Sequence, residues 1–168
     1  FVMGGSGGAH AINMAMKDAA SELRSVANLQ ILHQTGEKDV EDVKAGYRAA
    51  RVQAVVLPYI DDMAGAYAAA DLVVSRSGAT TVAELAVCGK RAVLIPYPFA
   101  ADNHQEHNAR SLAKRGGGEV IVQKDLTPAK LAAVIQRFAR DRDGAMSPLA
   151  STAAEEIVRA CKEYVQKD

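Results

Sequence analysis

Short apolar runs alternate with longer helix-like runs along nearly the whole sequence. The apolar runs are typical of buried strands: Phe1–Met3, Leu29–His33, Gln53–Leu57, Leu72–Ser75, Arg91–Ile95 and Glu119–Val122. The runs between and after them have helical spacing: Ala9–Arg24, Asp39–Ala50, Asp61–Ala70, Thr80–Cys88, His104–Lys114, Pro128–Arg140 and Leu149–Val165. Apolar strands separated by helices predict an α/β fold, with a parallel sheet covered by helices on both faces.

Every unusual loop in the sequence follows one of the predicted strands. In parallel sheets, ligands bind beyond the carboxyl ends of the strands, near the point where the strand order reverses. We therefore expect these loops to line one rim of the sheet: Gly4–Gly8, His33–Gly36, Tyr59–Met63, Ser75–Thr81 and Pro96–Gln105.

Composition narrows the class of protein. The 168 residues fit one domain, and 20 Lys and Arg balance 20 Asp and Glu, which argues against a nucleic-acid partner. No apolar run approaches the roughly 20 residues of a membrane span. The cysteines, Cys88 and Cys161, lack metal-ligand spacing, and we expect buried free thiols.

Because Phe1 stands inside a strand-like run, we expect a piece of a longer chain. The segment Asp141–Ser147 forms a polar break before the last predicted helix.

The segment Ser75–Glu84 carries the strongest chemical signal. It joins a strand to a helix through Ser, Gly and Thr, and a helix N-terminus attracts anions such as phosphate through its free N–H groups and dipole. Glu84 then stands one turn into the helix, where a carboxylate could accept hydrogen bonds from hydroxyls. The alternative is a capping box, in which Thr81 caps the helix and Glu84 satisfies a backbone N–H. Arg76 could equally be a surface ion-pair residue.

The glycine-rich loop Gly4–Gly8 permits a close approach of backbone to a phosphate or a sugar, and Ser6 could donate a hydrogen bond. It lacks the Gly-Lys-Ser/Thr ending of a P-loop. The alternative is a tight turn in which Ser6 caps the following helix.

Two further loops have both a binding and a structural interpretation. The polar groups of Asp102–Gln105 suit sugar hydroxyls, and Tyr59–Met63 could clamp a planar base. The alternatives are N-caps, by Asp102 or Asn103 in the first loop and by Asp61 or Asp62 in the second.

The histidines do not predict a metal site. His104 and His107 lie three residues apart without a third ligand at metal spacing. His33 ends a predicted strand on the rim, where a lone histidine is more often structural than catalytic.

Five blocks, taken in order, resemble the MurG-type N-acetylglucosaminyltransferases of peptidoglycan synthesis. The matching blocks cover nearly the whole chain: Gly4–Ala9, His33–Gly36, Tyr59–Met63, Ser75–Glu84 and Asp102–Ala109. The resemblance is to the C-terminal half of that family. It implies a Rossmann-like domain, the donor-binding half of a GT-B glycosyltransferase, over residues 1–168, with the N-terminal acceptor domain absent.

The resemblance implies specific roles for residues in these blocks. Ser6 would lie by the donor phosphates or at the edge of the cleft, the Ile60 backbone would read uracil with Met63 packed nearby, and Glu84 would accept the ribose hydroxyls. The diphosphate would meet the helix N-terminus, and His104 and Gln105 would meet the sugar. The full set of implied substrate-binding residues is Ser6, Ile60, Met63, Arg76, Ser77, Gly78, Ala79, Thr80, Thr81, Glu84, His104 and Gln105.

By the same resemblance, the donor is UDP-N-acetylglucosamine and the acceptor is an undecaprenyl-linked N-acetylmuramoyl-pentapeptide bound through the missing domain. The implied reaction is an inverting transfer that converts lipid I to lipid II in cell wall biogenesis. The catalytic base is expected in the missing N-terminal domain, and no cofactor is expected. The full-length enzyme would be a peripheral membrane protein on the cytoplasmic face.

Two alternatives share this fold. The chain could be the stand-alone donor-binding subunit of a two-chain N-acetylglucosaminyltransferase. It could also be a UDP-N-acetylglucosamine 2-epimerase, although those enzymes carry paired acidic residues where this sequence offers Glu84 alone.

Overall fold

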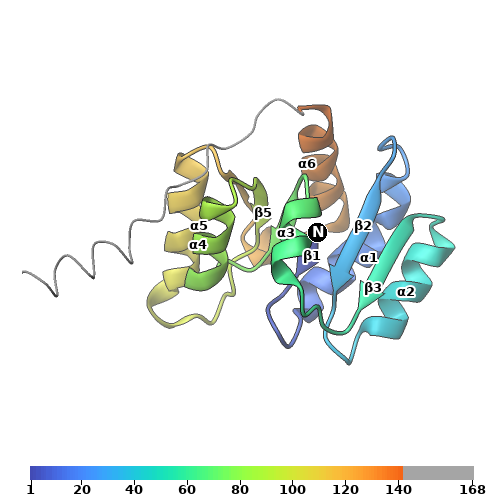
Figure 1. Cartoon of the computed structure of the whole chain (residues 1–168), viewed down its shortest axis with the longest axis horizontal. Helices are drawn as coiled ribbons and strands as arrows, with labels where there is room; N and C mark the ends of the chain where they lie inside the picture. Colours follow the sequence, from blue (N-terminus) through green and yellow to red (C-terminus); the bar gives the residue numbers. More distant parts are fainter. Residues whose placement is uncertain (142–168) are drawn as a thin grey trace, which may run out of the picture.

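The computed structural model describes residues 1–141, which fold around a six-stranded parallel sheet (Figure 1). Its strands are β1 (Val2–Met3), β2 (Gln30–Gln34), β3 (Gln53–Leu57), β4 (Val73–Ser75), β5 (Ala92–Leu94) and β6 (Gly118–Val120). They are ordered β3-β2-β1-β4-β5-β6, and every pairing is parallel. The predicted α/β class is confirmed, and the strand order is that of a doubly wound Rossmann sheet.

Within residues 1–141, six α-helices and two short 3₁₀ segments connect and flank these strands. The α-helices are α1 (His10–Leu23), α2 (Val40–Ala49), α3 (Met63–Ala69), α4 (Ala79–Val87), α5 (His104–Lys114) and α6 (Pro128–Arg140). The 3₁₀ segments are η1 (Ala101–Asn103) and η2 (Gln123–Asp125). The ends of α5 and α6 are as predicted, and the other predicted ends lie within a residue or two of those observed. The predicted helix Leu149–Val165 lies outside the described residues.

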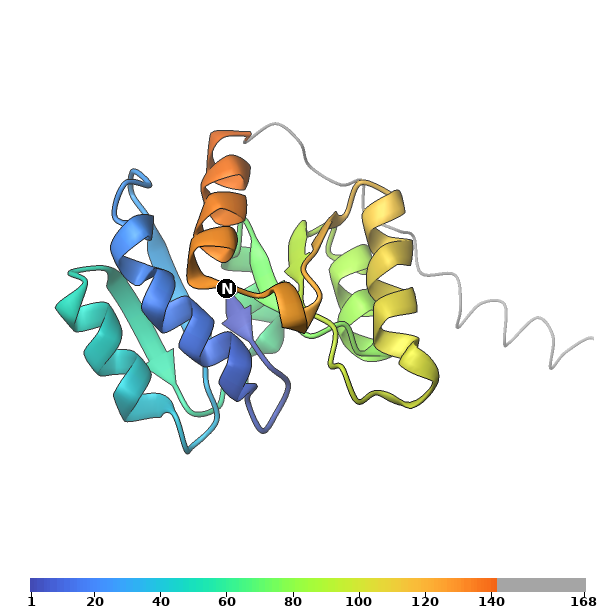
Figure 2. The ribbon, with the colours of Figure 1, turned by 180° about the vertical axis from the view of Figure 1, so that it is seen from behind.

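The helices cover both faces of the sheet, as predicted. One apolar cluster joins α1, α2 and α6 to the sheet, and a second joins α3, α4 and α5 to the opposite face. Val73 belongs to the second cluster and Val74 to the first, because successive strand residues point to opposite faces. Figure 2, seen from behind, brings α1, α2 and α6 in front of the sheet.

Local sequence signals explain where two of the helices begin. Thr127 Oγ1 accepts a hydrogen bond from Lys130 N at 3.2 Å, with Pro128 at the first position of α6. Asp62 Oδ1 accepts from Gly65 N at 2.8 Å and caps α3. The N-cap that the sequence offered for Tyr59–Met63 is therefore present.

One prediction about the cysteines is wrong. Cys88 is exposed, because it is the C-cap residue of α4 and lies beyond the buried stripe of that short helix. Cys161 lies outside the described residues. Within the described part of the chain, no helix has both the length and the apolar character needed to cross a membrane.

Candidate functional site

The loops that follow β1 to β5 share the carboxyl edge of the sheet, the rim. β1 and β4 are adjacent and parallel, yet the helices that follow them, α1 and α4, pack on opposite faces. This is the point at which the winding of the sheet reverses, where doubly wound folds bind their ligands. The geometry therefore places the glycine-rich loop and the start of α4 on the two sides of this reversal point, at the rim.

The glycine-rich loop is pressed against the loop after β2. Gly8 has φ +75°, and a Cβ atom there would lie 1.8 Å from Thr35 O. Gly36 has φ +76°, and its Cβ would lie 2.3 Å from Gly7 O. No side chain fits at either position, so the two glycines allow the loops to touch.

Ser6 lies exposed on this loop and does not cap α1. The N-cap of α1 is Ala9, which makes no side-chain capping bond. The predicted tight turn forms, since Gly8 N donates to Gly5 O at 3.0 Å, but the predicted cap by Ser6 is wrong, and its hydroxyl is on the surface of the rim.

Gln34 joins two loops of the rim, a role that sequence reasoning missed. Its Nε2 donates to Gly5 O at 2.9 Å, and its Oε1 accepts from Ile60 N at 3.0 Å. The side chain is buried, so the carboxamide acts as a fixed brace. Because the Ile60 N–H is engaged, the backbone group that Ile60 could offer to a base is its carbonyl oxygen. The only sign of this role in the sequence was that Gln34 is a polar residue at the end of a strand.

A buried polar network ties the loop after β2 to α1. Asn13 Nδ2 donates to Thr35 O at 2.8 Å, and Asn13 Oδ1 pairs with His33 Nε2 at 3.0 Å. The other ring nitrogen of His33 pairs with the Tyr47 hydroxyl at 2.9 Å. Burial lowers the pKa of His33 to about 3, so the imidazole is neutral at physiological pH. His33 is therefore structural, as its position in the sequence favoured.

The N-terminus of α4 is open to solvent at the rim. Its N-cap is Gly78, which makes no side-chain capping bond, and a Cβ at Gly78 would meet nothing within 4 Å. Ala79 and Thr80 are exposed and Thr81 is half-buried. The first N–H groups of a helix have no intrahelical acceptor, so this helix end offers donors and a positive dipole to an anion.

Glu84 is not part of a capping box. Thr81 lies inside α4 rather than at its N-cap, so the capping alternative is wrong. Glu84 Oε2 instead accepts a hydrogen bond of 2.9 Å from the Tyr67 hydroxyl on α3. The carboxylate is half-buried, and its position is fixed by a neighbouring helix rather than by its own backbone.

The Arg76 side chain points into the protein. Its guanidinium donates to Ile95 O and Pro96 O, both at 3.1 Å, and to Gln123 Oε1 at 2.6 Å. It also lies over the Tyr97 ring, 5.5 Å from the centroid. Burial lowers the pKa of Arg76. The surface ion-pair interpretation is wrong, because Arg76 anchors the loop after β5.

Ser77 and Gln105 lie together, although 28 residues separate them in the sequence. The Ser77 hydroxyl donates to Gln105 O at 2.8 Å, and Gln105 Oε1 accepts from Ser77 N at 3.3 Å and from Tyr97 N at 3.0 Å. Asn108 Nδ2 donates to Ser77 O at 3.2 Å. These bonds hold the start of α5 against the loop before α4 and orient the NH₂ group of Gln105 away from its two donors.

The loop before α5 does not contain the predicted side-chain cap. Asn103 occupies the N-cap position, yet its Nδ2 donates to Glu106 Oε2 at 2.9 Å and its side chain caps nothing. Asp102 and Asn103 both have left-handed backbone, with φ 47° and 53°. His104 is exposed, and its Nδ1 lies 2.7 Å from Ala101 O.

The remaining predicted contact residues lie at the start of α3 and the end of β4. Ile60 is buried and Met63 is half-buried at the first position of α3. Among the described residues, Ser75 Oγ is the one buried side-chain oxygen or nitrogen without a hydrogen-bond partner. Ser75 pairs in register with Met3 and Leu94, so it points to the face that carries α3, α4 and α5.

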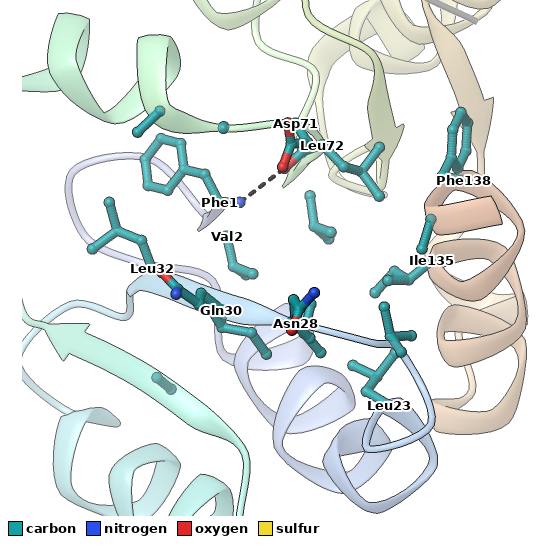
Figure 3. Close-up of a pocket in the computed structure, with 18 of the residues that line it drawn as sticks. Phe1, Val2, Leu23, Asn28, Gln30, Leu32, Asp71, Leu72, Ile135 and Phe138 are labelled. Carbon is teal, nitrogen blue, oxygen red and sulfur yellow. Dashed lines mark hydrogen bonds between the residues drawn. The ribbon is translucent and has the colours of Figure 1, made fainter. Parts of the chain in front are cut away.

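A cavity of about 720 Å³ lies at the opposite edge of the sheet (Figure 3). Its walls include Gln30, Leu72 and Phe138, and Phe1 N donates to Leu72 O beside it. None of the rim residues lines it, so it is separate from the candidate site. In residues 1–141, no group of three or more His, Cys, Asp or Glu side chains is arranged to hold a metal ion.

A comparison with protein families gives a match across nearly the whole chain. A family model described as the glycosyltransferase family 28 C-terminal domain matches residues 1–164. A protein of Syntrophotalea carbinolica is 48% identical over 99% of this chain and 49% of its own length. One of Syntrophus aciditrophicus is 45% identical over 98% of this chain and 48% of its own. Both are named UDP-N-acetylglucosamine--N-acetylmuramyl-(pentapeptide) pyrophosphoryl-undecaprenol N-acetylglucosamine transferase.

A solved structure gives the same relationship in three dimensions. The crystal structure of Acinetobacter baumannii MurG superposes with a TM-score of 0.81 at 32% identity, covering 96% of this chain and 51% of that one. A glycosyltransferase of kitacinnamycin superposes with a TM-score of 0.63 at 23% identity and shows only the shared fold. The chain thus spans about half the length of the transferases it matches.

Proposed function

The chain belongs to the glycosyltransferase family 28 C-terminal domain family, and on this basis we propose that it is the donor-binding domain of an inverting N-acetylglucosaminyltransferase. The observation that carries the proposal is the pairing, on one helix of the rim, of an open N-terminus with a carboxylate. The open helix end suits a diphosphate, and Glu84 suits hydroxyls further along the same ligand. A nucleoside diphosphate sugar combines these two groups.

UDP-N-acetylglucosamine is the proposed donor. Its diphosphate meets the N–H groups of Ala79, Thr80 and Thr81, and its ribose hydroxyls donate to Glu84. The uracil N3–H donates to the Ile60 carbonyl, the backbone group that Gln34 leaves open, and Met63 packs beside the base.

The remaining residues of the rim lie near the sugar and at the edge of the donor site. The NH₂ group of Gln105 and the imidazole of His104 lie toward the N-acetylglucosamine, and the Ser6 hydroxyl lies by the phosphates. Ser77 and Arg76 support the site without touching the donor, since their side chains are bound to α5 and to the loop after β5.

In the proposed reaction the acceptor C4 hydroxyl attacks the anomeric carbon of the donor, and the bond from that carbon to the β-phosphate oxygen breaks. Negative charge then develops on the departing UDP. The N-terminus of α4 stabilises this charge through N–H groups that are already oriented before the reaction. A base in the remaining half of the longer protein takes the acceptor proton.

The partners follow from the same assignment. The acceptor is the undecaprenyl-linked N-acetylmuramoyl-pentapeptide that appears in the names of the relatives, bound through the half of the enzyme that precedes this domain. The product is lipid II, for peptidoglycan synthesis. The whole enzyme works as a peripheral protein at the cytoplasmic face of the membrane that holds its lipid substrate.

Titration calorimetry tests the proposal. The chain is titrated with UDP and with UDP-N-acetylglucosamine, and with ADP as the mismatched nucleotide. Both uridine nucleotides are expected to bind and ADP to bind more weakly. The chain alone is expected to give no product with a lipid-linked acceptor. If neither uridine nucleotide binds, the proposed function is wrong.

A further inference from the structure

We propose that Tyr67 is a positioning residue for ribose recognition, acting through its hydrogen bond to Glu84. This inference rests on the proposed function, because it assumes that Glu84 receives the ribose hydroxyls of a uridine nucleotide. Tyr67 does not itself touch the ligand. It determines where the carboxylate stands before the ligand arrives.

The contact joins two helices that the sequence separates by 17 residues. The Tyr67 hydroxyl on α3 donates to Glu84 Oε2 on α4 at 2.9 Å. The same hydroxyl lies 3.5 Å from Met3 Sδ, on the last residue of β1. One phenol oxygen therefore connects the carboxylate to the strand that leads into the glycine-rich loop.

The Tyr67 ring has little freedom to move. The residue is 2% exposed, and its ring meets that of Phe1 edge to face, with centroids 5.7 Å apart. Burial, and then the bond to Glu84, raise the pKa of Tyr67. The hydroxyl thus keeps its proton at physiological pH, and its direction of donation to Glu84 is fixed.

A glutamate on a helix surface normally samples several rotamers, and ordering it during binding costs free energy. The bond from Tyr67 removes that cost in advance. A carboxylate has about four lone-pair positions, and Tyr67 occupies one of them. The remaining positions are available to the ribose hydroxyls. The expected consequence is a stronger preference for nucleotides that carry both hydroxyls.

The test compares UDP with 2′,3′-dideoxyuridine diphosphate, which lacks both hydroxyls, by titration calorimetry. In Tyr67→Phe, the affinity ratio of UDP to the dideoxy nucleotide is expected to fall by about threefold to tenfold. Affinity for the dideoxy nucleotide itself is expected to stay close to that of the unaltered chain. A purely structural role would instead lower both affinities together.

Tyr47→Phe is the matched control. It also removes a buried tyrosine hydroxyl, but Tyr47 belongs to the apolar cluster on the other face of the sheet, and its hydroxyl bonds to His33. Its affinity ratio is expected to equal that of the unaltered chain. An unchanged ratio in Tyr67→Phe, or an equal fall in Tyr47→Phe, would overturn the inference and leave the proposed function standing. Failure of the unaltered chain to bind UDP would overturn both.

A second measurement covers the case in which Tyr67→Phe does not fold. The unaltered chain is labelled with carbon-13 at the tyrosine Cζ, and the Tyr47 resonance is assigned from Tyr47→Phe. A second resonance from a buried tyrosine is expected to shift when UDP binds and to shift less with the dideoxy nucleotide. Equal shifts with both nucleotides would contradict a link between Tyr67 and the ribose.

Discussion

At the scale of single residues, the hydrogen-bond partners of a side chain decide its role. Glu84 and Arg76 belong to the same block of the sequence and both carry charge. Arg76 turns inward to two backbone carbonyl groups and Gln123, whereas Glu84 stays half-buried with one oxygen bonded to Tyr67. Glu84 therefore keeps acceptor positions for a ligand, whereas the guanidinium of Arg76 donates to groups within the protein.

Glu84→Ala is expected to weaken UDP binding by about 1–3 kcal/mol, the scale of hydrogen bonds to a charged group. Its effect on stability should come from the Tyr67 hydroxyl that loses its acceptor, because Glu84 caps nothing. Calorimetry and urea unfolding measure the two effects. Glu41→Ala, which removes an exposed carboxylate on α2, is the control. Unchanged UDP binding in Glu84→Ala would rule out the ribose contact.

Arg76→Ala is expected to lower the free energy of unfolding by about 2–3 kcal/mol, because it leaves buried acceptors without their donor. Arg48→Ala removes an exposed arginine from the last turn of α2 and should change stability little. Urea unfolding measures both variants. A variant of Arg76 that keeps full stability but no longer binds UDP would show that this arginine contacts phosphate.

At the scale of secondary-structure elements, strand-to-helix connections decide what the rim can bind. Gly8 and Gly78 each stand between a strand and a helix. From the sequence, either glycine could allow the backbone to approach a phosphate. Gly8 has left-handed backbone and lies against Thr35, whereas Gly78 has φ −58° and open space where a Cβ would be. Gly8 therefore allows two loops to pack against each other, whereas Gly78 leaves the N-terminus of α4 accessible to a ligand.

Substituting the two glycines is expected to have contrasting effects, on stability at Gly8 and on UDP binding at Gly78. Gly8→Ala is expected to destabilise the fold by about 2–4 kcal/mol, through its positive φ and the clash with Thr35 O. Gly78→Ala is expected to cost under about 1 kcal/mol of stability, yet its methyl group enters the space proposed for the diphosphate and should weaken UDP binding. Urea unfolding and calorimetry on both variants measure the contrast. Equal losses of stability would refute it.

At the scale of the whole molecule, buried polar groups link the fold to pH. Burial lowers the pKa of His33 to about 3, while an unfolded histidine titrates at about 6.5. Between these values the unfolded chain binds a proton that the folded chain does not. The free energy of unfolding therefore decreases as the pH falls through this window, by up to about 1.4 kcal/mol per pH unit from this group.

Urea unfolding at about pH 7 and about pH 5 measures this dependence. His33→Gln cannot titrate, and its stability is expected to change less between the two pH values than that of the unaltered chain. His107→Gln, at an exposed position on α5, should keep the full dependence. The same pH dependence in His33→Gln as in the unaltered chain would show that another group is responsible.

The spacing of apolar residues, together with the residues that begin helices, determined the fold almost completely. The alternation of apolar and helical runs predicted the parallel sheet, and Thr127 with Pro128 predicted the start of α6, because strand burial and helix capping depend on neighbours in the chain. The same patterns placed the candidate loops after strands, and a parallel sheet brings such loops to one edge.

Only the tertiary structure decided which polar side chains are bound within the fold and which stay open at the candidate site. The capping box at Thr81 and the caps at Ser6 and Asn103 were plausible from the sequence, yet none of them forms. The contacts of Gln34 with Ile60, of Ser77 with Gln105 and of Tyr67 with Glu84 join residues 17 to 28 positions apart. Local patterns do not encode such pairs, because a hydrogen bond between distant residues depends on how the helices and loops pack.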